Sequence, residues 1–290
     1  MNDFVLPIDK PVGPTSHDVV ARARRALHEK RIGHTGTLDP FASGLLLLCI
    51  GRATRLAEFL SGLPKTYIAD IMLDAFTDTD DRTGRRIRET DAWQSVDERR
   101  LRDALAHFTG IIRQVPPAYS AKKVGGERSY RAARRGESLD LQAVEVTIHA
   151  LRLLEFSPPL VRVDVDCSSG TYIRALARDV GAFLGTGGYL QELRRTRVGR
   201  FEVDDALPLD GIDDPATVAK HAVSPLDALR HLPRVDVDAA TADRLGHGQR
   251  VPFDGPLPDR DLVVASADRL VAIAAGRDGV LHPRKVFMES

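Results

Sequence analysis

The sequence predicts an α+β fold, with strands and amphipathic helices interspersed along a chain of 290 residues. Three patterns support this class: an unbroken apolar run over residues 45–50, strict alternation over 160–167, and helical spacing of apolar residues over 173–184. A short apolar run is typical of a buried strand, alternation of a half-buried strand, and intervals of three or four residues of an amphipathic helix. Because 43% of the residues are hydrophobic, the chain can bury a substantial core.

Capping and periodicity predict the first elements. Thr15 and Asp18 have the spacing of a capping box, and apolar residues follow at helical intervals, so we expect a helix over residues 15–30. The buried strand at 45–50 is expected to lead into a short helix at 53–60.

The next elements are a strand and a helix. Residues 66–73 place Tyr67 on the same face as three apolar side chains at period two, which predicts a strand that presents this tyrosine. Ser95 and Glu98 again have the spacing of a capping box, so we expect them to begin a helix that ends near residue 108.

A polar, basic and turn-rich segment at about 113–139 predicts a protruding insertion. Strands are expected again at 144–151 and 160–167, after which Gly170 turns the chain into the helix at 173–184. A turn from a strand into a helix is a favourable place for a functional side chain.

The end of the chain has a different character. Beyond residue 208 it becomes acidic and rich in proline, and four short strand-like pieces follow, at 249–252, 262–265, 270–275 and 280–287. We therefore predict a large domain at residues 1–232, which includes the insertion, and a small β-rich domain at 233–290.

The charges balance at 41 basic and 41 acidic residues, but their distribution is uneven. Between residues 113 and 135 there are seven Lys or Arg, one acid and two tyrosines, a composition that suits a nucleic-acid backbone. Residues 202–261 carry 13 acids and six Lys or Arg. Two further basic groups comprise Arg22, Arg24, Arg25, Lys30 and Arg31, and Arg194, Arg195, Arg197 and Arg200. The alternative for each group is a solvated face without a ligand.

Other classes of protein find little support. The two cysteines, Cys49 and Cys167, lie in apolar strand-like runs, as buried small hydrophobes do, and no zinc spacing is present. The longest apolar run is far shorter than the roughly 20 residues of a membrane-spanning helix, and the N-terminus lacks the basic start of a signal peptide. We expect a cytoplasmic protein.

Asp39 is the candidate nucleophile. It lies in a loop that contains Gly33, Gly36 and Gly44 and leads into the buried strand. The three glycines permit backbone angles closed to other residues, and Pro40 pushes Asp39 away from helical geometry, so we expect the chain itself to set the direction of the carboxylate. The alternative is an ordinary turn, since Asp and Pro are common in turns for local reasons.

Several segments together resemble one family. They are Asp9-Lys10-Pro11-Val12-Gly13-Pro14-Thr15-Ser16, Gly33-His34-Thr35-Gly36-Thr37-Leu38-Asp39-Pro40, Lys65-Thr66-Tyr67, Thr77-Asp78-Thr79-Asp80-Asp81, Gln114-Val115-Pro116-Pro117-Ala118-Tyr119-Ser120-Ala121-Lys122-Lys123, Gly170-Thr171-Tyr172-Ile173-Arg174 and Leu193-Arg194-Arg195-Thr196-Arg197. In order and spacing they resemble the TruB group of bacterial pseudouridine synthases, which modify the T-loop of tRNA. The resemblance is strong over residues 5–230.

The resemblance implies a pseudouridine synthase fold: a mixed, mainly antiparallel central sheet flanked by helices, with a short PUA-like domain at the C-terminus. It implies that a uridine in the T-loop of tRNA, at position 55, is isomerised to pseudouridine. Such a reaction needs a carboxylate and a proton acceptor but no cofactor and no metal. The implied partner is the T-arm of tRNA, with no protein partner.

The resemblance also implies roles for residues. Asp39 would be the nucleophile, ion-paired with Arg174, whose planar guanidinium fits a carboxylate better than lysine does and offsets the rise in pKa that burial causes. Tyr67 would stack on the extruded uracil and take part in proton transfer.

The remaining implied residues bind the substrate. Tyr172 would line the pocket and hydrogen-bond the ion pair, Leu193 would form an apolar wall, and His34 would stack on a flipped neighbouring nucleotide. His34 can also be an ordinary loop histidine. The insertion, with Lys122, Lys123 and Arg128, would clamp the tRNA backbone.

Three rival functions can be weighed. Asp78, Asp80 and Asp81 could suggest a metal or phosphoaspartyl site, but Arg82 and Gly84 break the calcium-loop pattern, and the resemblance implies a structural turn role for this cluster. A tRNA-binding protein without chemistry would not need Asp39. A glycoside hydrolase would need a second carboxylate in a partner motif, and the sequence offers none.

Overall fold

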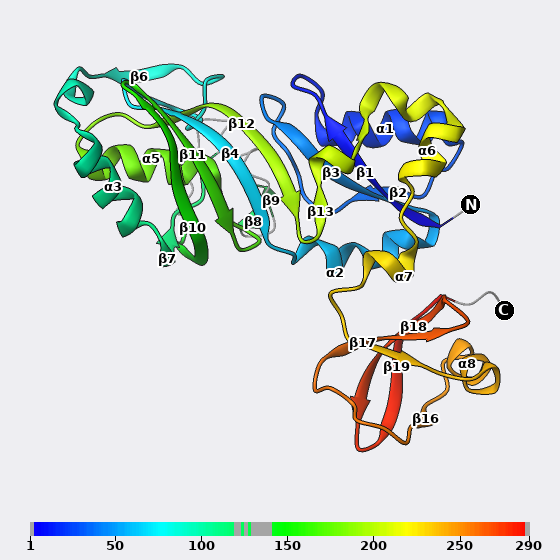
Figure 1. Cartoon of the computed structure of the whole chain (residues 1–290). Coiled ribbons are helices and arrows are strands. Elements are labelled where there is room, and N and C mark those ends of the chain that lie inside the picture. Colours follow the sequence, from blue (N-terminus) through cyan, green and yellow to red (C-terminus); the bar gives the residue numbers. More distant parts are fainter. Residues whose placement is uncertain (1–2, 119–122, 125–126, 129–140, 288–290) are drawn as a thin grey trace.

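The computed structural model describes residues 3–118, 123–124, 127–128 and 141–287, and it confirms the α+β class (Figure 1). Ten strands form one sheet, in the order β14-β1-β3-β12-β4-β11-β10-β7, with β2 added to β3 and β13 to β12. Among the described strands of this sheet, β1/β14 and β3/β12 are the parallel pairs, so the sheet is mixed and mainly antiparallel, as expected. The strands are Phe4–Lys10 (β1), Ile32–His34 (β2), Ser43–Ile50 (β3), Lys65–Met72 (β4), Gly110–Gln114 (β7), Val144–Ser157 (β10), Leu160–Cys167 (β11), Tyr189–Val198 (β12), Phe201–Glu202 (β13) and Leu207–Pro208 (β14).

Helices flank this sheet. In Figure 1, α1 and α6 lie beside β1 and β3, whereas α3 and α5 lie beside β4, β10 and β11. The α-helices are Ser16–Ala26 (α1), Ala57–Ser61 (α2), Glu98–His107 (α3), Ile173–Leu184 (α5), Pro215–His221 (α6), Pro225–Ala228 (α7) and Ala239–Gly246 (α8). Short 3-10 turns occupy Gly51–Leu56, Ala92–Ser95, Val203–Asp205 and Leu209–Asp213, and a small hairpin joins Ala75–Thr77 (β5) to Arg86–Glu89 (β6). The capping box predicted at Thr15 is present.

Strand β3 explains the unbroken apolar run. Leu46 and Leu48 belong to the core that also contains side chains of α1 and α5. Leu45 and Leu47 point to the opposite face and belong to a second core with Leu60 of α2. Both faces of the strand are therefore buried, and each fully buried leucine contributes about 1.5–3 kcal/mol.

Strands β3 and β12 approach closely at Gly44. Their ladder pairs Ser43 with Arg194 and Gly44 with Arg195. Gly44 has a φ of +102°, and a Cβ atom there would lie 2.2 Å from the carbonyl oxygen of Arg195. Only glycine fits this position. Of the three glycines in the Asp39 loop, Gly44 has a positive φ, whereas Gly33 and Gly36 do not.

The C-terminal part forms a second sheet, in the order β15-β17-β18-β19-β16, next to α8 (Figure 1). Its strands are Arg234–Asp236 (β15), Val251–Pro252 (β16), Asp261–Ser266 (β17), Arg269–Arg277 (β18) and Val280–Val286 (β19). Val263 and Ile273 pack in the same hydrophobic core as Leu56 and Leu60 of the larger part. The β-rich C-terminal part is confirmed, whereas the domain division into 1–232 and 233–290 remains a prediction.

Two local predictions were wrong, and some elements were not foreseen. Asp97, not Ser95, caps α3 by accepting a hydrogen bond from the Arg100 N–H, while Ser95 ends a preceding 3-10 turn. Strand β10 extends to Ser157, well beyond residue 151, because it pairs with β11 over its whole second half. Strand β12 and helix α8 were not predicted.

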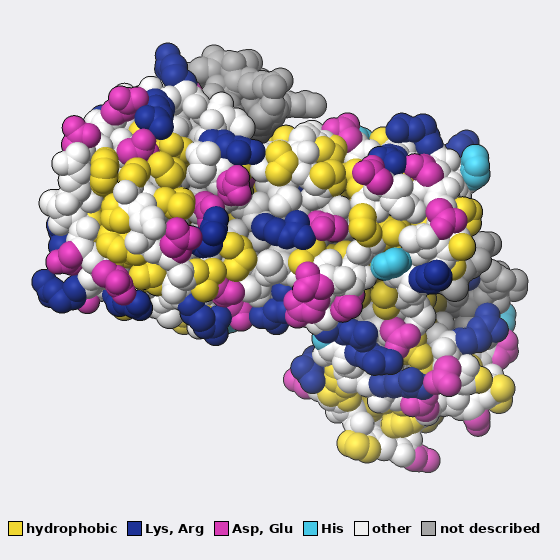
Figure 2. Space-filling view, turned by 45° about the horizontal axis from the view of Figure 1, so that its top comes forward, with side chains coloured by type: hydrophobic (Ala, Val, Ile, Leu, Met, Phe, Trp, Pro, Cys, Tyr) yellow, Lys and Arg dark blue, Asp and Glu magenta, His cyan; other side chains and the backbone are white. Residues whose placement is uncertain are grey.

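The basic surface is less uniform than the sequence suggested. Arg195 is 2% exposed and is an internal residue, not a surface one. Arg22 forms ion pairs with Asp210 and Asp213, which belong to the acidic stretch. Figure 2 shows basic and acidic side chains interspersed over the face in view. Of the predicted insertion, the structure describes residues 113–118 and two short strands, Lys123–Val124 (β8) and Glu127–Arg128 (β9), between which Lys123 pairs with Arg128.

Two further predictions can be compared with the structure. Cys49 and Cys167 are buried free thiols, as expected of small hydrophobes. Among the described residues, no helix is long and apolar enough to cross a membrane.

Candidate active site

The Asp39 loop is held on both sides of Asp39 by the first residue of α1 and by the segment that precedes this helix. The Ser16 hydroxyl donates to the Leu38 carbonyl oxygen at 3.0 Å and accepts from the Leu38 N–H at 2.8 Å. The Gly13 N–H donates to the carbonyl oxygen of Pro40 at 2.8 Å. Hydrogen bonds thus fix the residues on either side of Asp39, so its position depends on tertiary contacts as well as on the turn itself.

Asp39 and Arg174 meet in the structure. Arg174 is the second residue of α5, and its Nε atom lies 3.0 Å from Oδ2 of Asp39. The side chain of Arg174 is 7% exposed, whereas that of Asp39 is 36% exposed. The guanidinium is therefore fixed in the protein, and the carboxylate retains an open side toward solvent.

Arg174 also contacts a second carboxylate. Its Nη1 atom lies 3.6 Å from Oδ2 of Asp81 and donates to the carbonyl oxygen of Thr79 at 2.9 Å. Oδ1 of buried Asp81 accepts hydrogen bonds from Thr79 and Thr83. Because the N-terminus of a helix is the positive end of its dipole, a cation there needs nearby anions, and the two aspartates supply them.

The pKa of Asp39 lies above its ordinary value. Burial raises this pKa most, Arg174 opposes the rise, and the nearby charge of Asp81 adds to it. The carboxylate is thus more basic than a solvated aspartate, which suits it to accept a proton or to attack an electrophilic carbon.

Tyr67 lies on β4, opposite Arg195 in the β4/β12 ladder. It is 7% exposed, and burial raises the pKa of its hydroxyl, although a hydrogen bond from Arg195 opposes the rise. Arg195 also donates to the carbonyl oxygens of Leu45 and Gly36. One buried guanidinium therefore connects the tyrosine with the Asp39 loop, and the phenol is neutral near pH 7.

The other predicted residues of the site lie around this centre. His34 ends β2 and is half-buried; its Nδ1 atom accepts from the Gly36 N–H at 3.3 Å, and burial lowers its pKa, which favours the neutral ring. Tyr172 is the N-cap residue of α5, and Leu193 is a buried residue of β12. Lys122 lies outside the described residues, as do the side chains of Lys123 and Arg128.

A cavity of about 370 Å³ borders the Asp39 loop. It is lined by Phe41 and Ser43, which follow Asp39 in the chain, by Arg82, which follows Asp81, and by Leu193. Its volume is in the range of small-molecule sites. Leu193 therefore faces an open space next to the loop that carries the candidate nucleophile.

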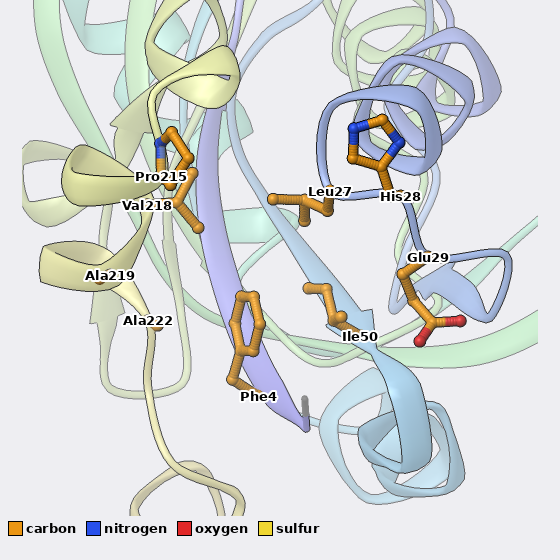
Figure 3. A pocket seen from close by; sticks show the side chains of 9 residues that line it. All are labelled: Phe4, Leu27, His28, Glu29, Ile50, Pro215, Val218, Ala219 and Ala222. Carbon is orange, nitrogen blue, oxygen red and sulfur yellow. The ribbon is translucent and has the colours of Figure 1, made fainter. Parts of the chain in front are cut away.

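A second cavity lies elsewhere (Figure 3). Its volume is about 390 Å³, and Phe4, Ile50 and Val218 form much of its apolar lining. Ile50 ends β3, whereas Asp39 precedes the start of that strand, so the length of β3, roughly 23 Å at about 3.3 Å per residue, separates the two regions. This cavity is not part of the Asp39 site.

Two participants in the site were missed at the sequence level. Asp81 was assigned to a turn, but it also contacts Arg174. Lys10 is completely buried and donates to the carbonyl oxygens of Pro11 and Pro14; burial lowers its pKa to about 8, with Asp39 opposing the shift. Both residues lie within the segments that resemble the family, and this was the signal in the sequence that could have pointed to them.

Family models match most of the chain. A model described as the TruB family pseudouridylate synthase N-terminal domain matches residues 24–173, and one described as the tRNA pseudouridylate synthase B C-terminal domain matches residues 174–232. This chain belongs to the TruB family. It is a tRNA pseudouridine synthase, an enzyme that isomerises uridine in tRNA to pseudouridine.

Curated relatives in the TruB family agree over the full length. The tRNA pseudouridine synthase B of Thermobifida fusca (strain YX) is 44% identical, with both chains covered completely. That of Ralstonia pickettii (strain 12J) is 42% identical, with 97% of this chain and 93% of the relative covered.

Two solved structures are similar to this chain over almost its whole length. A Cbf5-Nop10-Gar1 complex contains a chain with a TM-score of 0.78 and 27% identity, covering 99% of this chain and 85% of its own length. An H/ACA RNP bound to a substrate RNA containing 2'-deoxyuridine gives a TM-score of 0.76 and 25% identity, covering 99% of this chain and 85% of its own.

Proposed function

We propose that this enzyme isomerises the uridine at position 55, in the T-loop of tRNA, and that Asp39 is its nucleophile. The observation that carries the assignment of Asp39 is the ion pair with Arg174, in which a fixed guanidinium holds a carboxylate that is still open to solvent. The TruB motifs around both residues support the choice of substrate.

The reaction breaks the bond between N1 of uracil and C1′ of ribose and joins C5 to C1′, with no net gain or loss of atoms. An ionised carboxylate can serve any of three routes: attack on C1′, attack on C6, or stabilisation of positive charge on the sugar. The proton on C5 must leave at the end, and N1, which is freed from the sugar, takes up a proton, so the atoms balance. Arg174 stabilises the anionic form of Asp39, and the partial exposure of the carboxylate gives the substrate access to it.

The other residues bind and orient the extruded nucleotide. Tyr67 stacks on the uracil as a neutral phenol, a contact worth about 1–3 kcal/mol per base. Leu193 and Tyr172 line the pocket. His34, as a neutral ring, stacks on a neighbouring nucleotide, and neutrality lowers the cost of its desolvation.

Wider contacts complete the proposal. The insertion with Lys122, Lys123 and Arg128 contacts the backbone of the T-arm, a contribution that weakens as salt is added. The C-terminal part is PUA-like, and the enzyme works in the cytoplasm on tRNA without a protein partner. The large and small domains are those expected from the sequence, residues 1–232 and 233–290.

The proposal is tested by incubating the purified protein with unmodified tRNA and mapping pseudouridine chemically at single-nucleotide resolution. We expect product at the T-loop uridine. Asp39→Asn should lower the single-turnover rate more than about a thousandfold, because loss of a nucleophile removes most of the acceleration, while tRNA affinity is retained. Asp103→Asn, on the exposed side of α3, is the matched control.

Other outcomes would contradict the proposal. Product at a different uridine would refute the T-loop assignment, and an active Asp39→Asn enzyme would refute the nucleophile. Release of free uracil would indicate hydrolysis of the glycosidic bond instead of isomerisation.

A further inference from the structure

Gln114 makes a two-point contact with the start of the helix that carries Arg174. It is the last residue of β7, and its side chain is fully buried. Its amide nitrogen donates to the carbonyl oxygen of Tyr172 at 3.0 Å, and its amide oxygen accepts from the Tyr172 N–H at 2.8 Å. Both polar groups of one side chain are thus directed at the backbone of one residue.

This contact replaces a cap that the helix lacks. Tyr172 is the N-cap residue of α5 and makes no side-chain capping hydrogen bond. In a capping box, a Glu or Gln at the third helical position accepts from the N–H of the N-cap residue. That position is Ala175 here, which cannot accept, so Gln114 performs this role from another strand.

The position of Arg174 depends on where this helix begins. Arg174 is two residues after Tyr172 and contacts Asp39 at 3.0 Å and Asp81 at 3.6 Å. A displacement of about 1 Å in a catalytic geometry can lower a rate about a hundredfold. A shift of the first turn of α5 would therefore alter the Asp39–Arg174 pair before it changed the rest of the fold.

We propose that Gln114 is a positioning residue, which acts through the Tyr172 backbone to hold Arg174 against Asp39. The inference rests on the proposed role of Asp39. A second contact keeps α5 docked without Gln114: Arg178, one turn after Arg174, donates to the carbonyl oxygen of Val115 at 2.9 Å and pairs with Asp80 at 3.1 Å. Variants of Gln114 should consequently fold.

The test compares Gln114→Met, which keeps the size of the side chain and removes both hydrogen bonds, with Gln114→Glu, which keeps the acceptor and loses the donor. We expect Gln114→Met to lower the single-turnover rate about a hundredfold and Gln114→Glu about tenfold, with the tRNA dissociation constant unchanged. Ile111→Met, at an exposed position on the same strand, is the control. Rates are normalised to the folded fraction measured by circular dichroism.

A double-mutant cycle with Arg174→Lys decides whether Gln114 acts through Arg174. Once Arg174 is replaced, Gln114→Met should lower the rate less than about threefold, because coupled residues are not additive. Full activity of Gln114→Met, equal losses in both backgrounds, or a change in tRNA affinity alone would overturn the inference. Should the wild type make no pseudouridine, or Arg174→Lys be fully active, the proposed function itself would fail.

Discussion

Arg174 and Asp39 form an asymmetric ion pair. Nε of Arg174 lies 3.0 Å from Oδ2 of Asp39, but the arginine side chain is 7% exposed and the aspartate side chain 36%. The cation is fixed by the backbone of Thr79 and by Asp81, so only the anion can respond to a ligand. An approaching substrate therefore meets a carboxylate whose counterion is already in place, and little reorganisation is needed when charge develops.

Arg174→Lys should reduce catalysis without weakening tRNA binding. A lysine keeps the charge but cannot reach Asp39, Asp81 and the Thr79 carbonyl with one planar group. We expect the single-turnover rate to fall about tenfold to a hundredfold, and filter binding to give an unchanged dissociation constant. Equal rates for lysine and arginine would show that geometry at this position is unimportant.

Asp81→Asn should move the acid limb of the pH–rate profile. Activity requires ionised Asp39, so it is present above the pKa of Asp39 and is lost as the pH falls through it. The charge of Asp81 is one cause of the raised pKa of Asp39, so its removal should shift the acid limb to lower pH. Single-turnover rates across the pH range measure this shift. Asp78→Asn, at an exposed position in the same loop, should leave the limb in place.

Gly44→Ala should destabilise the fold severely. The added methyl group would lie 2.2 Å from the backbone of Arg195, at a φ of +102°. We expect a loss of more than about 3 kcal/mol in the free energy of unfolding, measured by urea denaturation. Gly36→Ala is the matched change in the same loop, because its nearest neighbour would be a side-chain atom at 3.6 Å. Similar losses for the two variants would contradict the close-approach argument.

Lys10→Met should change how stability depends on pH. Burial lowers the pKa of folded Lys10 to about 8 from its ordinary 10.5, so between these values the unfolded chain binds the extra proton. The free energy of unfolding of the wild type should therefore rise with pH relative to the variant, by about 3 kcal/mol over the whole interval. Chemical denaturation between pH 7 and 10 measures the difference. Lys220→Met, at an exposed position, is the control, and a constant difference for Lys10→Met would refute the prediction.

Periodicity of hydrophobic residues predicted the elements whose buried side chains are all apolar, such as β3 and β11. It missed β12 because this strand buries Arg195 among apolar residues, so the pattern of alternation is broken. Arg195 is tolerated there because it donates to the Leu45 and Gly36 carbonyl oxygens and to Tyr67, contacts that come from distant parts of the sequence. No local pattern contains that information.

The candidate site was also predictable only in part. The meeting of Asp39 and Arg174 followed from the resemblance, and the structure places the two together. The support around Asp39 was not foreseen: the Ser16 hydroxyl and the Gly13 N–H bind the backbone of the loop, and these contacts form only once the chain has folded. Asp81 was taken for a turn residue because its contact with Arg174 spans more than 90 positions in the chain.

The two-residue ladder between β3 and β12 has a mechanical consequence. This ladder joins the two halves of the sheet. One half is preceded by the Asp39 loop, and the other contains Tyr67 and leads through β11 to Arg174. Sliding of β3 along β12 would change the distance between Asp39 and Arg174 while each half of the sheet kept its own hydrogen bonds. The close contact at Gly44 therefore helps to keep the nucleophile and its counterion at a fixed distance.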